Sequence, residues 1–408
     1  MKCRHCHAEL QLPFIDLETA PPSNSYLTPE QLAAPEKWFP LRVVTCTNCW
    51  LVQTEDYAHF ADLFSSDYAY FSSFSSSWLN HAQRYVAQMV DRFGLTGESH
   101  VIEVASNDGY LLQYVQERGI PCLGIEPTQS TAQAARAKGI KVLEKFFSQK
   151  LGEQLADEGR SADLTAANNV LAHVPDINDF VAGFARVLKP AGVATFEFPH
   201  LVKLVAECQF DTIYHEHFSY LSLSAVTTIF AANGLSVFDV EEIETHGGSL
   251  RVYAQRSDTG IRATSPAVAE LLNRETALGV CSAGYYQGFQ SRAERIKDDL
   301  LSFLIEARRG GRTVGGYGAA AKGNTLLNYA GIRSNLLPWV VDRNPAKQGK
   351  YLPGSRIAVV DEEHLRRSKP HYVLILPWNL RTEVMAQLAY VREWGAEFVT
   401  AVPDLAIQ

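Results

Sequence analysis

The sequence predicts an α/β protein with two doubly wound units and a small N-terminal segment of different character. Short apolar strands alternate with helical patterns from residue 100 onward, and the alternation starts again after residue 310. The first 60 residues instead contain two close pairs of cysteines. A chain of 408 residues has room for two or three domains. We expect them at residues 1–60, 61–260 and 261–408.

The central unit is predicted to begin with a helix over residues 78–93. Four strands follow, at residues 100–104, 122–125, 164–167 and 193–198. A turn at residues 107–109 leads into a helix over residues 110–118, and a Leu-Lys-Pro-Ala-Gly turn at residues 188–192 precedes the fourth strand. In such sheets ligands bind outside the carboxyl ends of the strands, so the residues that follow each strand are candidates for a site.

A long helical stretch over residues 266–309 separates the central unit from the last one, and we expect it to break near Gly284. The last unit is predicted to start with a strand at residues 312–314 and a glycine-rich turn at residues 315–323 that enters a helix. Its further strands are expected at residues 339–341 and 372–376.

Composition and charge exclude several classes of protein. Hydrophobic residues make up 46% and charged residues 20%, which is typical of a globular protein and not of a disordered chain or a coiled coil. The net charge of -8 gives no general basic field, so we expect no nucleic-acid partner. No apolar run approaches the roughly 18 residues of a membrane span, and the first residues lack a signal core. We therefore expect a cytoplasmic protein with no membrane contact and no obligate protein partner.

The two cysteine pairs predict a structural zinc site formed by Cys3, Cys6, Cys46 and Cys49. A two-residue spacing lets both thiolates of a pair bind one tetrahedral ion, and two pairs complete a four-sulfur shell without an open catalytic position. The neighbouring His5 and His7 are alternative ligands. Disulfides are the competing interpretation, but a reducing cytosol disfavours them.

A turn rich in small residues follows the first strand of the central unit, at residues 103–109, and Glu126 ends the second strand. Such a turn lets backbone approach a ligand, and the acid can bind ribose hydroxyls of a dinucleotide or of S-adenosylmethionine. The Gly-x-Gly-x-x-Gly pattern for a pyrophosphate is absent, which favours S-adenosylmethionine, although a purely structural turn remains the alternative. The candidate cofactor contacts are Glu103, Ala105, Ser106, Asn107, Asp108, Glu126, Pro127, Phe147, Asn168 and Asn169.

The segment Tyr214-His215-Glu216-His217-Phe218-Ser219-Tyr220 concentrates histidines and tyrosines. On a strand His215 and His217 would share one face with Glu216 opposite, whereas on a loop all three could converge. A metal site lacks an obvious third ligand, so a histidine base is the favoured interpretation and a polar core cluster the alternative. His173 follows the third strand and is expected to face the cofactor.

Two further segments are candidate ligand contacts. Residues 315–323 with Asp342 look like a dinucleotide fingerprint with irregular glycine spacing, although Lys322 could instead bind a substrate phosphate. The serine- and aromatic-rich stretch at residues 68–77 suits a lid over a sugar or nucleotide, or is a plain surface loop.

Taken together, these motifs resemble the bacterial C-methyltransferases that modify nucleotide-linked deoxysugars. The resemblance covers nearly the whole chain. It rests on both cysteine pairs, on the segments at residues 103–109 and 169–174 with Glu126, and on the histidine segment. It extends to residues 245–251, 316–324 and 377–379. One departure is Ala105, where the family has glycine.

The resemblance implies a Rossmann-like S-adenosylmethionine methyltransferase core, a small N-terminal zinc-binding domain and a C-terminal Rossmann-like domain. It implies methyl transfer to carbon-3 of a nucleoside-diphosphate-linked 4-keto sugar through an enolate, with His217 as the base. Tyr214 and Tyr68 would bind the ketone oxygen, Glu216 would orient His217 or bind the sugar, and His173 would assist. The substrate contacts would include Ser72, Ser73, Gly247, Ser249, Lys322, Asn324, Tyr351, Trp378 and Asn379.

Three other functions compete with this expectation. An oxygen or nitrogen of another small metabolite could accept the methyl group. The C-terminal glycine-rich turn could serve an NAD-dependent dehydrogenase. A non-enzymatic zinc adaptor is the third, and the acidic charge and the histidine segment argue against it.

Overall fold

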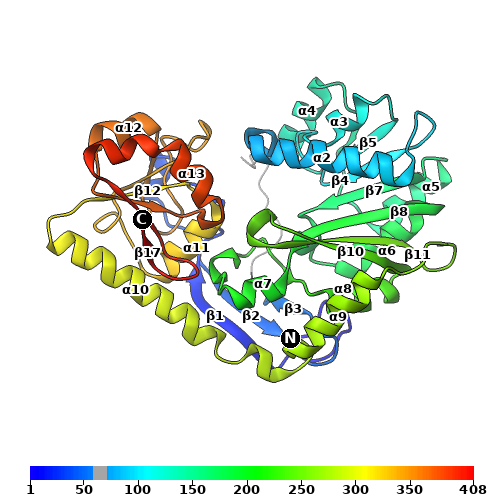
Figure 1. Cartoon of the computed structure of the whole chain (residues 1–408), viewed down its shortest axis with the longest axis horizontal. Helices are drawn as coiled ribbons and strands as arrows, with labels where there is room; N and C mark the ends of the chain where they lie inside the picture. The colour runs from blue at the N-terminus through cyan, green and yellow to red at the C-terminus, as the bar shows by residue number, and fades with distance from the viewer. Residues whose placement is uncertain (58–70) are drawn as a thin grey trace.

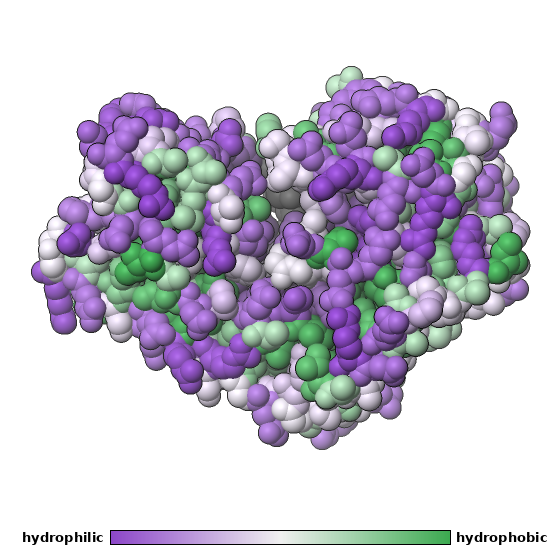
Figure 2. All heavy atoms as spheres, viewed as in Figure 1, coloured by the Kyte–Doolittle hydropathy of each residue, from purple (hydrophilic) through white to green (hydrophobic). Residues whose placement is uncertain are grey.

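The computed structural model describes residues 1–57 and 71–408; the expected contact Tyr68 lies outside these residues. Three sheets organise the described chain. In Figure 1 a central lobe (residues 71–256) and a C-terminal lobe (residues 312–408) flank the strands of the N-terminal module (residues 1–57). The space-filling view shows a hollow between the two lobes (Figure 2).

The N-terminal module forms most of a four-stranded antiparallel sheet. Its strands are β1 (Leu12–Ala20), β2 (Phe39–Thr45) and β3 (Val52–Thr54). The fourth strand, β9 (Ser219–Tyr220), comes from the middle of the chain and pairs with β3. On β2 the alternate residues Leu41, Val43 and Thr45 are buried, as expected for a strand with one face toward a core.

The central lobe contains a seven-stranded sheet in the order β10-β11-β8-β7-β4-β5-β6. Its strands are β4 (Val101–Val104), β5 (Cys122–Ile125), β6 (Val142–Leu143), β7 (Ala162–Asn168), β8 (Leu188–Pro199), β10 (Leu235–Ile243) and β11 (Ser249–Arg256). Pairing is parallel from β6 to β8, and β11 is antiparallel to both neighbours. The connections reverse direction at β4, which creates a crevice at the carboxyl ends of β4 and β7.

Helices cover both faces of this sheet, as a doubly wound fold requires. Helices α2 (Ser76–Phe93), α3 (Leu112–Gln116) and α4 (Gln129–Ala137) share a core with Val101. Helices α5 (Gln149–Asp157), α6 (Ile177–Val187) and α8 (Leu223–Ala232) share the opposite core with Ile102. The short helix α7 (Leu201–Ala206) follows β8 and packs toward the N-terminal module.

The predicted turn at residues 188–192 is wrong, because β8 already begins at Leu188. Leu188 pairs with Ala162 and Val193 with Leu164, so the extra residues form a bulge within the strand. Gly192 fits there because a Cβ atom would lie 2.7 Å from the Ala162 carbonyl oxygen. The predicted helix over residues 110–118 is also shorter, at Leu112–Gln116.

The connector breaks into two helices as expected, α9 (Pro266–Leu278) and α10 (Phe289–Arg309), with a 3-10 turn at Ala283–Tyr286 between them. The C-terminal lobe has a six-stranded sheet in the order β14-β13-β12-β15-β16-β17. Its strands are β12 (Val314–Tyr317), β13 (Trp339–Val341), β14 (Ala358–Val360), β15 (Tyr372–Ile375), β16 (Glu397–Thr400) and β17 (Ala406–Ile407). Its α-helices are α11 (Ala321–Tyr329), α12 (Glu362–Ser368) and α13 (Arg381–Gln387).

The glycine-rich segment of this lobe differs from the prediction, because Gly315 and Gly316 lie in strand β12 and not in a turn. A Cβ atom on Gly315 would lie 2.0 Å from the Trp339 ring, and one on Gly316 would lie 2.7 Å from Val340. These glycines therefore make room for bulky neighbours on β13. Across residues 1–57 and 71–408, no helix has the length and hydropathy needed to cross a bilayer.

Candidate active site

The turn after β4 lies at the crevice of the central sheet and holds an unusual backbone. Ala105, Asn107 and Gly109 have φ angles of 58°, 48° and 76°. A Cβ atom on Gly109 would lie 2.4 Å from Ile140, so the turn packs tightly against the segment before β6. Such left-handed residues bring backbone N–H groups to one side of the turn, where they can approach a ligand.

Hydrogen bonds tie this turn to its neighbours. The Asn107 N–H donates to Glu126 Oε2 and the Thr128 N–H to Glu126 Oε1, both at 2.9 Å. On the other side, the Ser72 N–H donates to Asn107 Oδ1 at 3.0 Å and the Ser73 N–H donates to Asp108 Oδ2 at 3.3 Å. The structure therefore brings the predicted residues of the turn, Glu126 and the two serines together at one edge of the sheet.

Several buried polar atoms at this edge have no hydrogen-bond partner among the described residues. They are Ser106 Oγ, Asp108 Oδ1 and both side-chain amide atoms of Asn168 and Asn169. Burial is also the main reason why the pKa of Glu103 lies well above its usual value. Because unsatisfied buried polar groups are costly, the edge fits a polar ligand such as a nucleoside. Pro127 lies partly exposed beside Glu126, whereas Phe147 packs edge-on against Phe184 in the aromatic core.

His217 is buried, with 8% of its surface exposed. Its Nδ1 lies 2.9 Å from the Thr212 carbonyl oxygen, which can only accept, so Nδ1 carries the proton and Nε2 the lone pair. The rings of Tyr214 and His173 lie at centroid distances of 4.0 Å and 4.5 Å. Burial, followed by the charge of His173, holds the pKa of His217 well below its usual value. His217 is therefore neutral near pH 7 and can accept a proton at Nε2.

Residues 214–217 form a turn, because the His217 N–H donates to the Tyr214 carbonyl at 2.9 Å, and only Ser219 and Tyr220 of the segment lie in a strand. His215 consequently points away from His217, and its Nε2 faces the carbonyl oxygens of Phe39 and Pro40 at 3.3 Å and 3.2 Å. Of the two arrangements considered from the sequence, the strand with both histidines on one face is therefore excluded, and on the observed turn His215 and His217 do not converge.

Glu216 is fully buried and faces the N-terminal module. Its Oε1 accepts a hydrogen bond from Asn24 Nδ2 at 3.1 Å, and its Oε2 has no partner among the described residues. Burial raises the pKa of Glu216. The N-terminal module, through Asn24, therefore positions this carboxylate.

The C-terminal lobe contributes a lysine to the same region. Lys322 Nζ donates to Asn379 Oδ1 at 2.7 Å and lies 4.5 Å above the Trp378 ring. Trp378 Nε1 in turn donates to Asp211 Oδ2 of the central lobe at 2.7 Å. Burial lowers the pKa of Lys322 and raises the pKa of Asp211 to about 6. The charge of Lys322 also contributes to the lowered pKa of His217, so the two groups lie close enough to interact.

Some predicted substrate contacts instead join parts of the protein. Asn324 Nδ2 donates to the Ser23 carbonyl at 2.6 Å, and Tyr351 exchanges backbone hydrogen bonds with Leu27. Ser249 Oγ donates to the Thr245 carbonyl at 2.8 Å. Gly247 packs against Trp378, where a Cβ atom would lie 2.6 Å from the ring. These residues form contacts between segments of the protein that surround the site.

His246 is a residue of this region that the sequence interpretation missed. It has a φ of 57°, precedes two glycines with positive φ, and its ring lies 5.2 Å from that of Trp78. Burial, with the charge of Lys322 second, lowers the pKa of His246 to about 4. The signal was present, since a histidine before Gly-Gly lies in a segment already singled out by the resemblance.

The four predicted zinc ligands come together, with their sulfur atoms all within 4.8 Å of one another. All four are free thiols; the Cys3 and Cys49 sulfurs are 3.6 Å apart and those of Cys6 and Cys46 are 3.5 Å apart. His5 is not part of the set, because its Nδ1 lies 2.7 Å from Asn178 Oδ1. Four convergent sulfurs fit a tetrahedral ion with no open position.

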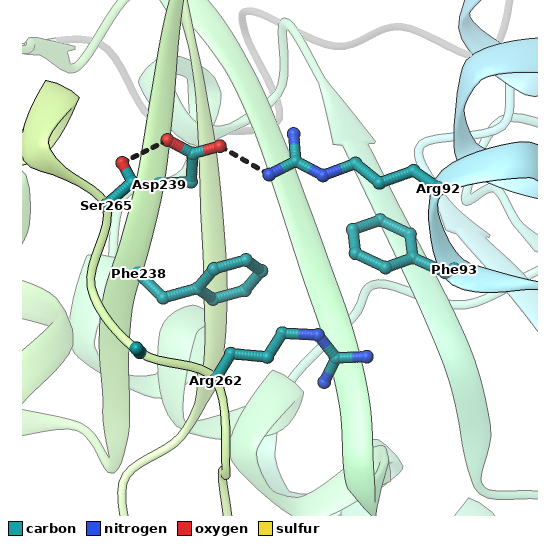
Figure 3. A pocket seen from close by; sticks show the side chains of 7 residues that line it. Arg92, Phe93, Phe238, Asp239, Arg262 and Ser265 are labelled. Carbon is teal, nitrogen blue, oxygen red and sulfur yellow. Dashed lines mark hydrogen bonds and ion pairs between the residues drawn. The ribbon is translucent and has the colours of Figure 1, made fainter.

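A separate surface pocket lies at the edge strand β10, away from these groups. It is lined by Arg92, Phe93, Phe238, Asp239, Arg262, Ala263 and Ser265 (Figure 3). Arg92 pairs with Asp239, which also accepts from Ser265, and Arg262 donates to the Ala191 carbonyl at 2.8 Å. Its charged groups thus form ion pairs and hydrogen bonds within the edge of the central lobe.

Three family models match the chain in succession. They are described as "Putative zinc binding domain" (residues 3–64), "Methyltransferase domain" (residues 78–240) and "C-methyltransferase C-terminal domain" (residues 244–403).

Among curated proteins, the C-methyltransferase NovU of Streptomyces niveus is 34% identical over 405 residues, which is 99% of this chain and 96% of that protein. A ubiquinone biosynthesis O-methyltransferase of Alkalilimnicola ehrlichii is 32% identical over 114 residues, or 28% of this chain and 45% of that protein. Among solved structures, magnesium protoporphyrin IX methyltransferase of Synechocystis with bound SAM has 14% identity and a TM-score of 0.35, covering 50% of this chain and 86% of that one. Because NovU matches nearly the full length of both chains and the family models follow in the same order, the chain belongs to the C-methyltransferase family.

Proposed function

We propose that the protein transfers a methyl group from S-adenosylmethionine to carbon-3 of a nucleoside-diphosphate-linked 4-keto sugar. The proposal rests mainly on the protonation state and ring orientation of His217. A neutral imidazole whose Nδ1–H is fixed by the Thr212 carbonyl presents the Nε2 lone pair to a substrate. A carbon next to a ketone is acidic enough for such a base, whereas most other carbon acceptors are not.

The crevice after β4 would hold the cofactor. The unsatisfied amides of Asn168 and Asn169, with Ser106 and Asp108, supply donors and acceptors for a nucleoside, and Glu126 has lone pairs left for ribose hydroxyls. When bound there, S-adenosylmethionine supplies an electrophilic methyl group. The residues that follow act on the sugar.

The proton step uses groups that lie together in the structure. His217 Nε2 takes the proton from carbon-3, and the electron pair of the broken C–H bond passes into the enolate, whose charge rests on the ketone oxygen. Tyr214, whose ring lies 4.0 Å from that of His217, and the cation of Lys322 are suited to stabilise that oxygen or the nearby diphosphate. Tyr68, at residues outside the described structure, and His173 are proposed to assist.

Through the charge of Lys322, substrate binding would also change the basicity of His217. Its charge helps to hold the pKa of His217 low. A diphosphate beside Lys322 would offset that charge, so a bound substrate makes His217 a stronger base than it is in the free enzyme. Trp378 and Asn379 would keep the lysine in place for this contact.

The four cysteines are proposed to bind structural zinc, since their sulfurs leave no position for a substrate. Four thiolates at this spacing repel one another, and a divalent ion removes that repulsion.

The test compares His217→Asn with His215→Gln. The asparagine amide can still donate to the Thr212 carbonyl but has no equivalent of Nε2, so we expect methyl transfer to fall by at least about 100-fold while S-adenosylmethionine affinity is unchanged. His215→Gln alters a histidine two positions away that faces backbone carbonyls, and it should retain most of the activity.

The assay uses labelled S-adenosylmethionine with a panel of dTDP-, GDP- and CDP-linked 4-keto sugars, followed by NMR of the product. A methyl singlet on a quaternary carbon supports the proposal. A methyl on oxygen or nitrogen, or full activity of His217→Asn, contradicts it.

A further inference from the structure

The turn that carries His217 is fastened to the zinc-binding module by a strand pair. Strand β9 follows this turn directly, and its only partner in the sheet of the described chain is β3. Val52 pairs with Tyr220 and Gln53 with Ser219, and the Thr54 N–H donates to the Phe218 carbonyl at 3.2 Å. The ladder therefore runs back along the chain to the residue next to His217.

Thr54 adds the contact that reaches His217 itself. Its Oγ1 donates to the His217 carbonyl oxygen at 3.1 Å, and Thr54 is only 3% exposed. His217 is consequently held at two points: its ring by the Thr212 carbonyl and its backbone by Thr54. Two such contacts restrict rotation of both the peptide and the side chain. This restriction keeps Nε2 in a fixed orientation toward a substrate.

The cysteine cluster fixes the strand that carries Thr54. The pair Cys46–Cys49 forms the connection from β2 to β3, closed by a hydrogen bond from the Cys46 N–H to the Leu51 carbonyl at 2.9 Å. The fully buried Gln53 donates to Cys3 Sγ at 3.3 Å and accepts from the Arg4 N–H at 2.9 Å. Both cysteine pairs therefore converge on β3.

Arg4 provides a second route from the first cysteine pair to the turn. Its Nη2 donates to the Thr54 carbonyl at 3.0 Å, and its guanidinium lies 4.8 Å above the ring of Phe218. Its Nη1 donates to the Pro175 carbonyl, two residues after His173. One arginine between Cys3 and Cys6 thus contacts the segments that carry His173 and His217.

We infer that the zinc-binding module is a positioning device for the catalytic turn, and that Thr54 is the positioning residue through which it holds His217. This inference rests on the proposed role of His217 as the base. The module thereby does more than stabilise the N-terminus, because a strand of the active-site segment completes its sheet.

Thr54→Val tests the inference, with Thr45→Val as a matched control. Both threonines are buried on neighbouring strands of the module, but Thr45 Oγ1 has no hydrogen-bond partner among the described residues. Each substitution removes one hydroxyl from the same module, and only Thr54→Val removes a contact with the turn. We expect kcat to fall by about 10- to 100-fold in Thr54→Val, with KM, cofactor affinity and zinc content unchanged, and to stay at the native value in Thr45→Val.

Hydrogen exchange gives a readout that does not depend on activity. The peptide covering residues 214–221 should exchange faster in Thr54→Val than in Thr45→Val, and faster in the native protein after a chelator has removed the zinc. The peptide covering β11 (residues 249–256) should be unchanged in both comparisons. Equal kcat and equal exchange in the two variants overturn the inference, and so does chelation that opens β11 as much as the turn.

Failure of the proposed function looks different. If His217→Asn keeps full activity, His217 is not the base, whatever the two threonine variants do. If His217→Asn is inactive while Thr54→Val behaves as Thr45→Val, the base assignment stands and only the positioning role is wrong.

Discussion

Ala105 shows how a single residue sets the shape of the cofactor turn. Its φ of 58° is a left-handed conformation that costs a residue with a Cβ atom about 1–2 kcal/mol, whereas glycine adopts it without strain. Glycine, which the family resemblance leads us to expect at this position, would fit this backbone without a Cβ atom. The turn has this conformation in spite of the methyl group because the hydrogen bond from the Asn107 N–H to Glu126 and the packing of Gly109 hold it.

Ala105→Gly is therefore expected to raise the free energy of unfolding by up to about 1 kcal/mol, since relief of strain exceeds the added entropy of the unfolded chain. Urea unfolding at neutral pH measures it. Ala166→Gly is the control, because Ala166 is buried on the neighbouring strand β7 in an extended conformation and its replacement should destabilise by about 1 kcal/mol. A loss of stability in Ala105→Gly equal to that of Ala166→Gly would contradict the strain argument.

His215 and His217 show what the sequence could not predict about single residues, namely the orientation of their side chains. The segment could be singled out because histidine and tyrosine rarely crowd together without a polar role. Which imidazole faces the site could not be predicted, because His215 is turned away by carbonyl oxygens of Phe39 and Pro40, about 175 positions earlier in the chain. The alternation of side chains along a strand does not apply to a turn, so it could not predict which histidine faces the site.

Among the elements, the connection from β2 to β3 depends most on something other than apolar packing. It contains Cys46 and Cys49, and the strand it leads into has only three residues. So short a strand is marginal unless its ends are fixed. The proposed zinc ion would fix one end, and β9 covers the free edge of the strand.

Cys46→Ser should lower both zinc content and thermal stability, because a serine oxygen is a poor substitute for a thiolate and three ligands hold the ion less well. Metal analysis and a melting curve are the measurements. Cys281→Ser, at an exposed cysteine outside the cluster, should leave both unchanged. A Cys46→Ser protein with full zinc content and unchanged melting would show that the cluster is not a structural metal site.

Periodicity predicted some helices and strands closely, such as α2 and β4, whereas β1, β2, β3, β10 and β11 were not predicted. Two of the errors involve glycines that lie in strands and not in the predicted turns. Gly315 and Gly316 suggested a turn but lie in β12, since Trp339 of the neighbouring strand needs their space. Strand β9 was not predicted at all, because two residues carry no periodicity and only their partner β3 makes them a strand.

At the scale of the whole molecule, the candidate site is assembled from all three parts of the chain. The central lobe provides His217, His173 and His246, the C-terminal lobe provides Lys322, and Asn24 of the N-terminal module holds Glu216. Convergence of such distant residues could be anticipated only through the resemblance to a family, and the domain boundaries near residues 60 and 260 stay a prediction. A site built in this way gathers several ionisable groups into one region of low polarity, which has a consequence for the stability of the protein in acid.

The consequence follows from the lowered pKa values of the histidines. Burial lowers the pKa of both His173 and His246 to about 4, against about 6.5 in an unfolded chain. Below pH 6.5 the unfolded chain therefore binds protons that the folded protein does not. The contribution of these two histidines to the free energy of unfolding is thus fully present above pH 6.5 and is lost as the pH drops toward 4.

His246→Gln should remove part of this acid sensitivity, because glutamine does not titrate. Between pH 7.5 and pH 4.5 we expect the variant to lose about 1–3 kcal/mol less stability than the native protein, the lower figure applying if water reaches the ring. Urea unfolding at the two pH values measures the difference, with His371→Gln, at an exposed histidine of the C-terminal lobe, as the control. If His246→Gln and the native protein lose stability in parallel, His246 is protonated equally in the folded and unfolded states. That result would exclude a neutral His246 imidazole beside Trp78 in the folded protein.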